Sequence, residues 1–470
     1  MAKGLFARKA IADFEADLAV EGRSLRRALG PVDLVLLGIG CIIGTGIFVL
    51  TGVAAVNHAG PAVIASYGIA GVVCALAALC YSEFATMLPI SGSAYSYSYA
   101  TLGELVAWII GWDLILEYAL AASAVAVGWS GYVRDILGGF GLEIPAAIAG
   151  SPGSQEGAVF NLPATLILLL TTGLLVIGIR ESARANAVIV AIKLFVVLFV
   201  IAIGSFYVTP ANWSPFAPMG FQGVVAGAAT VFFAYIGFDA VTTAAEEARN
   251  PERDMTIGIV GSLAVCTVLY LAVAAVVTGM VPLDQIDTAA PVAQAFRSHG
   301  LDFAGGLISA GAIAGLSSVL LVLLLGQSRI FFAMSRDGLL PGVFSAVHPR
   351  FGTPHVSTIG VGVIVAGIAG FVPLKELAEL ANIGTLFAFV IVSLGVLVLR
   401  RSEPGRRRPF RTPWVPLVPL LATAGAFYLM AALPWATWLR FLAWLGLGIA
   451  IYFGYSRHHS RVAAALRAGR

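Results

Sequence analysis

Long apolar stretches constrain this chain more than any other feature. Twelve segments are each long enough to cross roughly 30 Å of hydrocarbon, and short polar loops separate them. Backbone amides in lipid must be paired within the segment, and the alternating polarity of barrel strands is absent. The sequence therefore predicts an all-α membrane protein with twelve transmembrane helices, over residues 33–56, 62–87, 97–130, 161–179, 185–207, 222–247, 257–280, 303–334, 356–373, 378–399, 414–433 and 438–456.

Composition and charge support this fold class and suggest how the chain is divided. Only 11% of the residues are charged, against about 25% in soluble proteins. The first 30 residues are charged and lack the apolar core of a cleavable signal peptide. We expect an amphipathic arm at 1–30, helices 1 to 5 at 31–210, helices 6 to 10 at 211–400, and helices 11 and 12 with a tail at 401–470.

The distribution of positive charge predicts the orientation. All but five of the 28 lysines and arginines fall on the side that holds both termini. Four lie on the other side, at Arg134, Arg297, Lys375 and Arg440, and Lys193 lies within a span. Because positive residues favour the cytoplasmic side, we expect an inner-membrane protein with both termini in the cytoplasm.

Several partner and cofactor classes find no support in the sequence. The cysteines all lie in apolar spans without Cys-x-x-Cys spacing, and the histidines form no metal-ligand pattern. The basic segment 400–411 is more typical of an anchor to anionic membrane lipid than of a nucleic-acid contact. We expect no metal and no cofactor, and no feature identifies a protein partner.

The first predicted helix is rich in glycine near its middle. The run Gly38-Ile-Gly40-Cys-Ile-Ile-Gly44-Thr-Gly46 destabilises a helix by about 1 kcal/mol per glycine relative to alanine. Close packing between helices would explain Gly40 and Gly44, but it gives no reason for Gly46 beside Thr45. We therefore favour an unwound segment over packing alone.

The sixth predicted helix has a second interruption, at Gly237. A single glycine is a weak signal, but these two helices each open a group of five spans, and matching interruptions are typical of an inverted repeat with a binding site. Free amides near a half-helix N-terminus suit a carboxylate, and free carbonyls suit an ammonium group. The predicted site for a zwitterion comprises residues of both breaks: Ile42, Ile43, Gly44, Thr45, Gly46, Phe233, Ala234 and Ile236.

These and other stretches resemble the amino acid–polyamine–organocation superfamily, in particular bacterial members of its cationic amino acid transporter branch. The matching runs cover most of residues 30–400 and include "LGIGCIIGTGIFVLTG", "FFAYIGFDAVTTAAEEARNPERDM" and "GQSRIFFAMSRDGLLP". The resemblance implies the 5+5 inverted repeat of the sodium-coupled leucine transporter type plus two extra helices, with alternating access and an amino acid as substrate. One departure is Thr256, which stands where the family usually has proline in a loop.

Lys193 lies deep in the fifth span with apolar neighbours. An intramembrane charge costs at least ~2.5 kcal/mol and is usually functional. The resemblance implies that a lysine here replaces the sodium ion of sodium-coupled relatives, and desolvation allows such a group to titrate. We expect Lys193 to couple transport to protons. Ser317 and Ser318 either hydrogen-bond Lys193, bond within their own helix, or hold sodium, so a sodium site stays an alternative.

Acidic residues and the pocket lining bear on the substrate. We expect structural hydrogen bonds at Glu83 and Asp113 and leave the role of Glu117 open. Leu323 sits in an aliphatic run that favours small neutral amino acids such as alanine, unless it faces lipid. The alternatives are a cationic amino acid uniporter or exchanger and, in a different class, a membrane nutrient receptor. An enzyme is the least favoured class, because no Gly-x-Ser-x-Gly or His-Glu-x-x-His motif occurs.

Overall fold

Helices make up almost all of the regular structure that the computed structural model describes, in residues 7–9, 28–88, 93–178 and 183–467. By length and composition, eight helical stretches of this part could each cross a membrane: Gly46–Met87, Glu104–Gly139, Asn186–Tyr207, Gly220–Thr242, Pro251–Met280, Asp302–Arg336, Leu374–Ser402 and Trp435–His459. Four shorter apolar helices accompany them: Pro31–Ile42, Leu162–Ile177, His355–Phe371 and Leu417–Ala431. The predicted all-helical membrane architecture is confirmed at this level.

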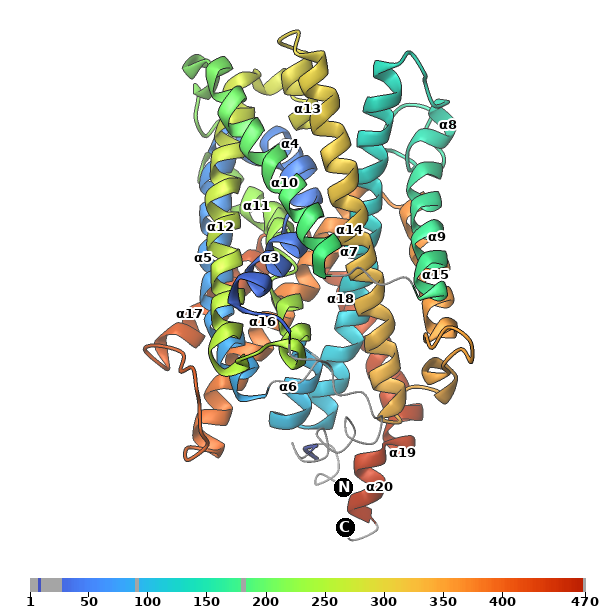
Figure 1. Ribbon diagram of the computed structural model, residues 1–470. Coiled ribbons are helices and arrows are strands. Elements are labelled where there is room, and N and C mark those ends of the chain that lie inside the picture. Colours follow the sequence, from blue (N-terminus) through green and yellow to red (C-terminus); the bar gives the residue numbers. More distant parts are fainter. Residues whose placement is uncertain (1–6, 10–27, 89–92, 179–182, 468–470) are drawn as a thin grey trace.

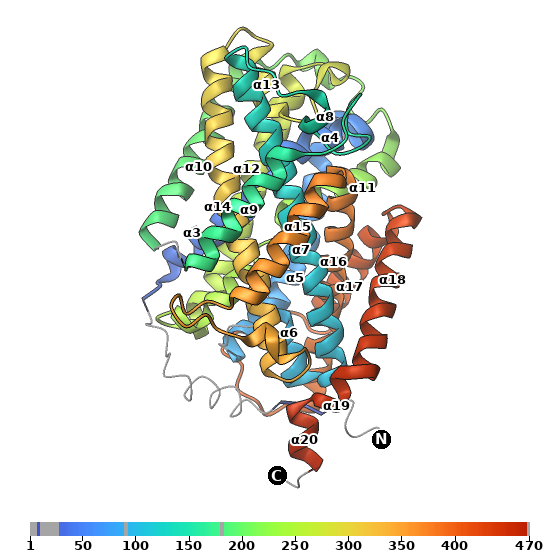
Figure 2. The same ribbon diagram turned by 90° about the vertical axis from the view of Figure 1, so that its right-hand side faces the viewer.

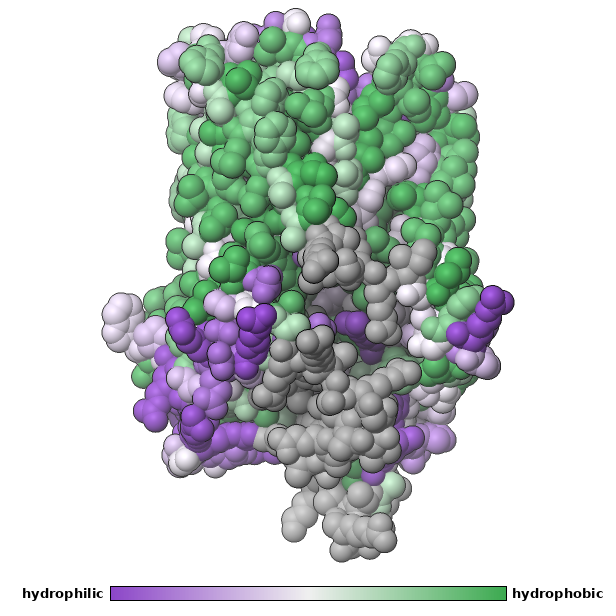
Figure 3. Space-filling model, viewed as in Figure 1, coloured by the Kyte–Doolittle hydropathy of each residue, from purple (hydrophilic) through white to green (hydrophobic). Residues whose placement is uncertain are grey.

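Large apolar side chains cover the flanks of the bundle. Figure 3 shows a broad hydrophobic surface above one hydrophilic end. Such an extensive exposed apolar surface is unfavourable in water and suits contact with lipid tails. The exposed side chains come from several outer helices and include Leu170, Phe195, Val268, Ile364 and Leu442.

The interior packing of the bundle involves two groups of helices. Helix α7 (Glu104–Gly139) packs along α14 (Asp302–Arg336) and, on another side, along α16 (Leu374–Ser402). Helix α12 (Pro251–Met280) packs against α3 (Pro31–Ile42) and α5 (Val63–Met87). This arrangement encloses two helices that are interrupted near Gly44 and Gly237 (Figure 1).

The remaining long helices lie at the periphery. Helix α9 (Leu162–Ile177) pairs with α15 (His355–Phe371), and α10 (Ala183–Gly204) packs on α14, α3 and α12. Helices α17 (Leu417–Ala431) and α18 (Trp435–Ile451) stand at one side of the bundle (Figure 2). They contact α16, and α18 also contacts α7.

The region predicted as the third span contains two helices instead of one. The single helix expected over 97–130 is wrong, because the chain forms α6 (Ser93–Thr101) and then starts α7 at Glu104. Gly103 separates them with a φ of +99°, which a helix cannot contain. The expected arm at 1–30 falls mostly on residues 1–6 and 10–27, which lie outside the described residues.

Both ends of the described chain meet at the last turn of α14. The Lys9 ammonium lies 2.8 Å from Oδ1 of Asp337, and both side chains are buried. Tyr95 of α6 donates to the other carboxylate oxygen over 2.7 Å. The backbone amide of Arg461, at the start of α20 (Arg461–Arg467), donates to the Asp337 carbonyl over 3.1 Å.

Candidate functional site

The first interrupted helix breaks at the predicted position. Helix α3 ends at Ile42, Ile43 adopts an extended backbone with ψ of 103°, and helical structure resumes with η1 (Gly46–Leu50). It continues through α4 (Thr51–Ala54) and η2 (Ala55–Ala59). The residues between the two halves therefore lack continuous helical hydrogen bonding, as the glycine content indicates.

The structure changes the interpretation of the glycines in this break. A Cβ atom at Gly46 would lie 2.2 Å from Cα of Ala234, so only glycine allows the two interrupted helices to touch. A Cβ atom at Gly44 would meet nothing closer than 3.6 Å, an ordinary contact with Val319. The expectation that packing explains Gly44 but not Gly46 is wrong, because the closest helix contact lies one residue beyond Thr45.

The second interrupted helix has a sharper break. Helix α11 (Gly220–Val231) tightens into the 3₁₀ turn η6 (Phe232–Tyr235), and the 3₁₀ helix η7 (Asp239–Glu247) follows after three residues, Ile236 to Phe238. Gly237 has a φ of +115°, and a Cβ atom there would lie 3.0 Å from the backbone of Cys41. Both the dihedral angle and the close approach to α3 require glycine.

Buried tyrosines hold the two breaks together. The Tyr270 hydroxyl of α12 lies 2.8 Å from the Ile42 carbonyl oxygen and 2.9 Å from that of Ala234. The Tyr67 hydroxyl donates to the Gly46 carbonyl over 2.9 Å. Sequence reasoning missed these tyrosines, because an aromatic residue in an apolar helix gives no local signal. Each carbonyl oxygen keeps a second lone pair for another donor.

The other predicted residues of the breaks differ in their surroundings. The Phe233 carbonyl accepts the amide of Ile236 over 3.2 Å and so closes the turn. The Thr45 hydroxyl is fully buried beside Gly128 of α7 and has no hydrogen-bond partner in the described part of the chain. A buried hydroxyl without a partner is unfavourable, so Thr45 suits a polar ligand.

A small cavity lies beside the break at Gly237. Of the predicted substrate residues, Ile236 and Leu323 line it, and Glu117 does so too. The cavity has a volume of ≈ 20 Å³. It can hold about one water molecule and is too small for an amino acid. The other lining residues come from four elements: Cys41, Tyr118, Ala121, Gly237, Asp239, Ala240, Val319 and Val322.

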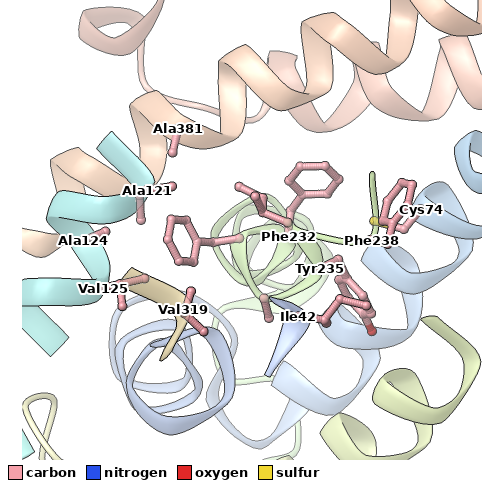
Figure 4. Close-up of a cluster of buried hydrophobic side chains, with 14 of the residues drawn as sticks. Ile42, Cys74, Ala121, Ala124, Val125, Phe232, Tyr235, Phe238, Val319 and Ala381 are labelled. Carbon is pink, nitrogen blue, oxygen red and sulfur yellow. The ribbon is translucent and has the colours of Figure 1, made fainter. Parts of the chain in front are cut away.

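Apolar side chains crowd around this region. Ala121, Ala124 and Val125 project from α7 toward Val319 of α14. Phe232 and Phe238 flank the second break, and Ile42 marks the first (Figure 4). Because these side chains are buried, the two breaks sit inside the bundle and face no lipid.

Lys193 projects from α10 into the interior. It is fully buried, and its Nζ donates to the Gly40 carbonyl oxygen over 2.7 Å. Its side chain runs along Gly315 of α14, where an added Cβ atom would lie 3.0 Å from Cε. The lysine therefore bridges α3, α10 and α14 just before the first break.

The two serines of α14 bond within their own helix. Ser317 donates to the Ile313 carbonyl over 2.8 Å and accepts from Trp129 over 3.0 Å. Ser318 donates to the Gly315 carbonyl over 3.2 Å. These are the ordinary back-bonds that the sequence analysis kept as an alternative.

Glu83 has the structural role that we expected. Arg400 donates to both of its carboxylate oxygens over 2.9 and 2.8 Å, and Arg408 Nε lies 3.2 Å from Oε1. The amide of Thr412 donates over 2.8 Å. These contacts hold the last turn of α16 and the segment that follows it against the end of α5.

The other acidic residues behave differently. The expectation of structural hydrogen bonds at Asp113 is wrong, because neither oxygen of this fully buried side chain has a partner among the described residues. Oε2 of Glu117 also has none. Asp239, which sequence reasoning missed as a site residue, lines the cavity together with Glu117. Its position two residues after Gly237 was the available signal.

Comparison with known proteins points to transport. A sequence model of the amino acid permease family matches residues 29–447. The methylthioribose transporter of Bacillus subtilis is 53% identical over 456 residues, which are 97% of this chain and 98% of that protein. The branched-chain amino acid permease BcaP of the same bacterium is 51% identical over 465 residues, 98% of this chain and 100% of the permease. The vacuolar cationic amino acid transporter 4 of Arabidopsis thaliana is 41% identical over 386 residues, 81% of this chain and 64% of the plant protein.

Proposed function

The chain belongs to the amino acid permease family and is a membrane transporter rather than an enzyme, and we propose that it carries a small neutral L-amino acid together with a proton. The observation that carries this proposal is the contact of two interrupted helices at Gly46 and Ala234, beside a buried cavity. The half-helix that starts near Gly46 offers amides for a carboxylate. The Ile42 and Ala234 carbonyls, ordered by Tyr270, offer acceptors for the α-ammonium group.

The small cavity supports alternating access. Since its ≈ 20 Å³ cannot hold an amino acid, the binding site must expand before substrate enters. The contacts between the breaks are the ones that an expansion would change. We further propose twelve spans, a 5+5 inverted repeat over 31–400, and an inner-membrane orientation with both termini in the cytoplasm.

The cavity wall supports a neutral side chain. Val319, Val322 and Leu323 of α14 present an aliphatic surface. The relative named as a branched-chain amino acid permease agrees with such a lining. Two alternatives keep specific support: Glu117 and Asp239 in the wall suit a cationic side chain, and their oxygens also suit the hydroxyls of methylthioribose, which the other Bacillus relative is named for.

Lys193 supports proton coupling. Its buried ammonium donates to the Gly40 carbonyl at the end of α3, so loss of a proton would weaken the link between α3, α10 and α14. A change of this kind beside the first break would favour a different arrangement of the interrupted helix.

Reconstitution in liposomes tests the proposal. We expect labelled L-alanine to accumulate faster with an inward proton gradient than without one. A protonophore, which collapses the gradient, should abolish this difference in rate. Competition with L-isoleucine, L-arginine and methylthioribose tests the substrate class. Inhibition by arginine alone would refute the neutral substrate, inhibition by methylthioribose alone would move the substrate class to thio-sugars, and uptake that ignores the gradient would refute the coupling.

A further inference from the structure

Asp113 is a buried carboxyl group that the proposed mechanism does not use. It is fully buried on α7, and both of its oxygens lack a hydrogen-bond partner in the described residues. An isolated carboxylate in such surroundings is strongly unfavourable, and a group of this kind holds a proton instead. A proton on Asp113 would remove this penalty.

Glu117 lies between Asp113 and the cavity. It follows Asp113 by four residues on the same helix, which places the two side chains about 5–6 Å apart at Cβ. Both meet α16 at Gly384, where an added Cβ atom would lie 2.9 Å from Oδ1 of Asp113 and 3.7 Å from Cβ of Glu117. Glu117 lines the cavity, and its unpartnered Oε2 is available to water there.

The charges around the pair are few. Glu117 is an acidic neighbour of Asp113 on α7, and Asp239 of η7 is an acidic neighbour of Glu117. Helix α16 presents Gly384 to the pair and Thr385 to Glu117, and α14 presents the amide of Gln327, which donates to the Ile115 carbonyl. Among the described residues, no lysine or arginine of these elements forms an ion pair with Asp113 or Glu117. Asp113 and Glu117 are therefore two interacting buried carboxyl groups, and the loss of a proton by one of them affects the other.

We propose that Asp113 and Glu117 form a second proton site, distinct from Lys193, that loads and unloads through the cavity. When the cavity hydrates, the Glu117 carboxylic acid releases its proton to cavity water and becomes a carboxylate. Asp113 then passes its proton to Glu117 and carries the negative charge itself. In the other half of the cycle, water in the cavity returns one proton to Glu117 while Glu117 hands its own proton back to Asp113, so each turnover moves one proton through the pair.

The inference rests on the proposed proton-coupled transport and is tested with the variant Asp113→Asn, which keeps the shape of a neutral carboxylic acid but cannot release a proton. In liposomes we expect it to exchange labelled substrate across the membrane near the wild-type rate, and to move one proton fewer per substrate than wild type. The matched control is Asp254→Asn, which alters a buried carboxylate at the start of α12 away from the cavity.

The outcomes separate the two proposals. Wild-type uptake that moves no protons overturns the coupling itself, and this leaves Asp113 without its role. Wild-type proton movement that Asp113→Asn reproduces in full overturns only the second site. If Asp113→Asn does not fold, Asp113→Glu and infrared spectroscopy replace it: a protonated-carboxyl band in wild type that shifts in this variant and responds to substrate supports the site, and an unresponsive band overturns it.

Discussion

Gly46→Ala is the sharpest test of the contact between the two interrupted helices. The added methyl group would lie 2.2 Å from Cα and 2.3 Å from Cβ of Ala234, whereas carbon atoms in contact are about 3.5–4.0 Å apart. Because the nearest atom belongs to the backbone, no rotamer change relieves the overlap, and the halves must separate by more than 1 Å. Overpacking of this kind costs about 1–3 kcal/mol, and we expect the upper end here.

The consequence is measurable in transport. A penalty of about 3 kcal/mol on the closed arrangement reduces its population roughly a hundredfold. We expect Gly46→Ala to abolish most labelled-alanine uptake in liposomes and to lower the thermal unfolding temperature in detergent. Gly44→Ala is the matched control, since its methyl group meets Val319 at an ordinary 3.6 Å. Equal uptake by the two variants would refute the reasoning.

Three further variants test other contacts. Lys193→Ala removes the ammonium bonded to Gly40, and we expect uptake to lose its acceleration by a proton gradient; full retention of that acceleration contradicts the coupling role. Tyr270→Phe removes the hydroxyl that lies against the Ile42 and Ala234 carbonyls, and we expect a loss of about 1–3 kcal/mol in stability together with weaker substrate binding. The control Tyr428→Phe changes an exposed side chain and should leave both stability and binding unchanged. Glu83→Gln removes the buried negative charge opposite Arg400 and Arg408, so we expect a destabilisation of about 3–5 kcal/mol in thermal unfolding with no change in substrate competition. An unaltered unfolding temperature would speak against a structural role of these ion pairs.

The sequence was informative where local composition alone disrupts a helix. The glycine-rich run around Thr45 and the single Gly237 correctly indicated both breaks, because glycine can adopt backbone conformations that other residues avoid. The long apolar runs likewise indicated the helices. Gly103 carried a similar signal, since Glu104 after a glycine is typical of a helix start, but the tyrosine-rich stretch before it and the apolar run after it hid this signal.

The sequence was uninformative where a contact joins distant residues. Tyr270 meets the Ile42 and Ala234 carbonyls only through packing of α12 on both breaks, and nothing in its own segment shows this. The use of Gly46 was misjudged for the same reason, because its neighbour Ala234 is remote in sequence. The presence of Asp239 and Glu117 in the wall of one cavity also depends on the tertiary fold.

Asp337 gives the chain an unusual mechanical property. Its carboxylate holds Lys9 and its backbone carbonyl holds Arg461, so one residue receives both ends of the polypeptide. Asp337 also follows the last residue of α14, the helix in which Gly315 contacts Lys193 and Leu323 lines the cavity. A pull on the chain near Lys9 or Arg461 would therefore act on α14, the helix that also contributes Leu323 to the cavity wall.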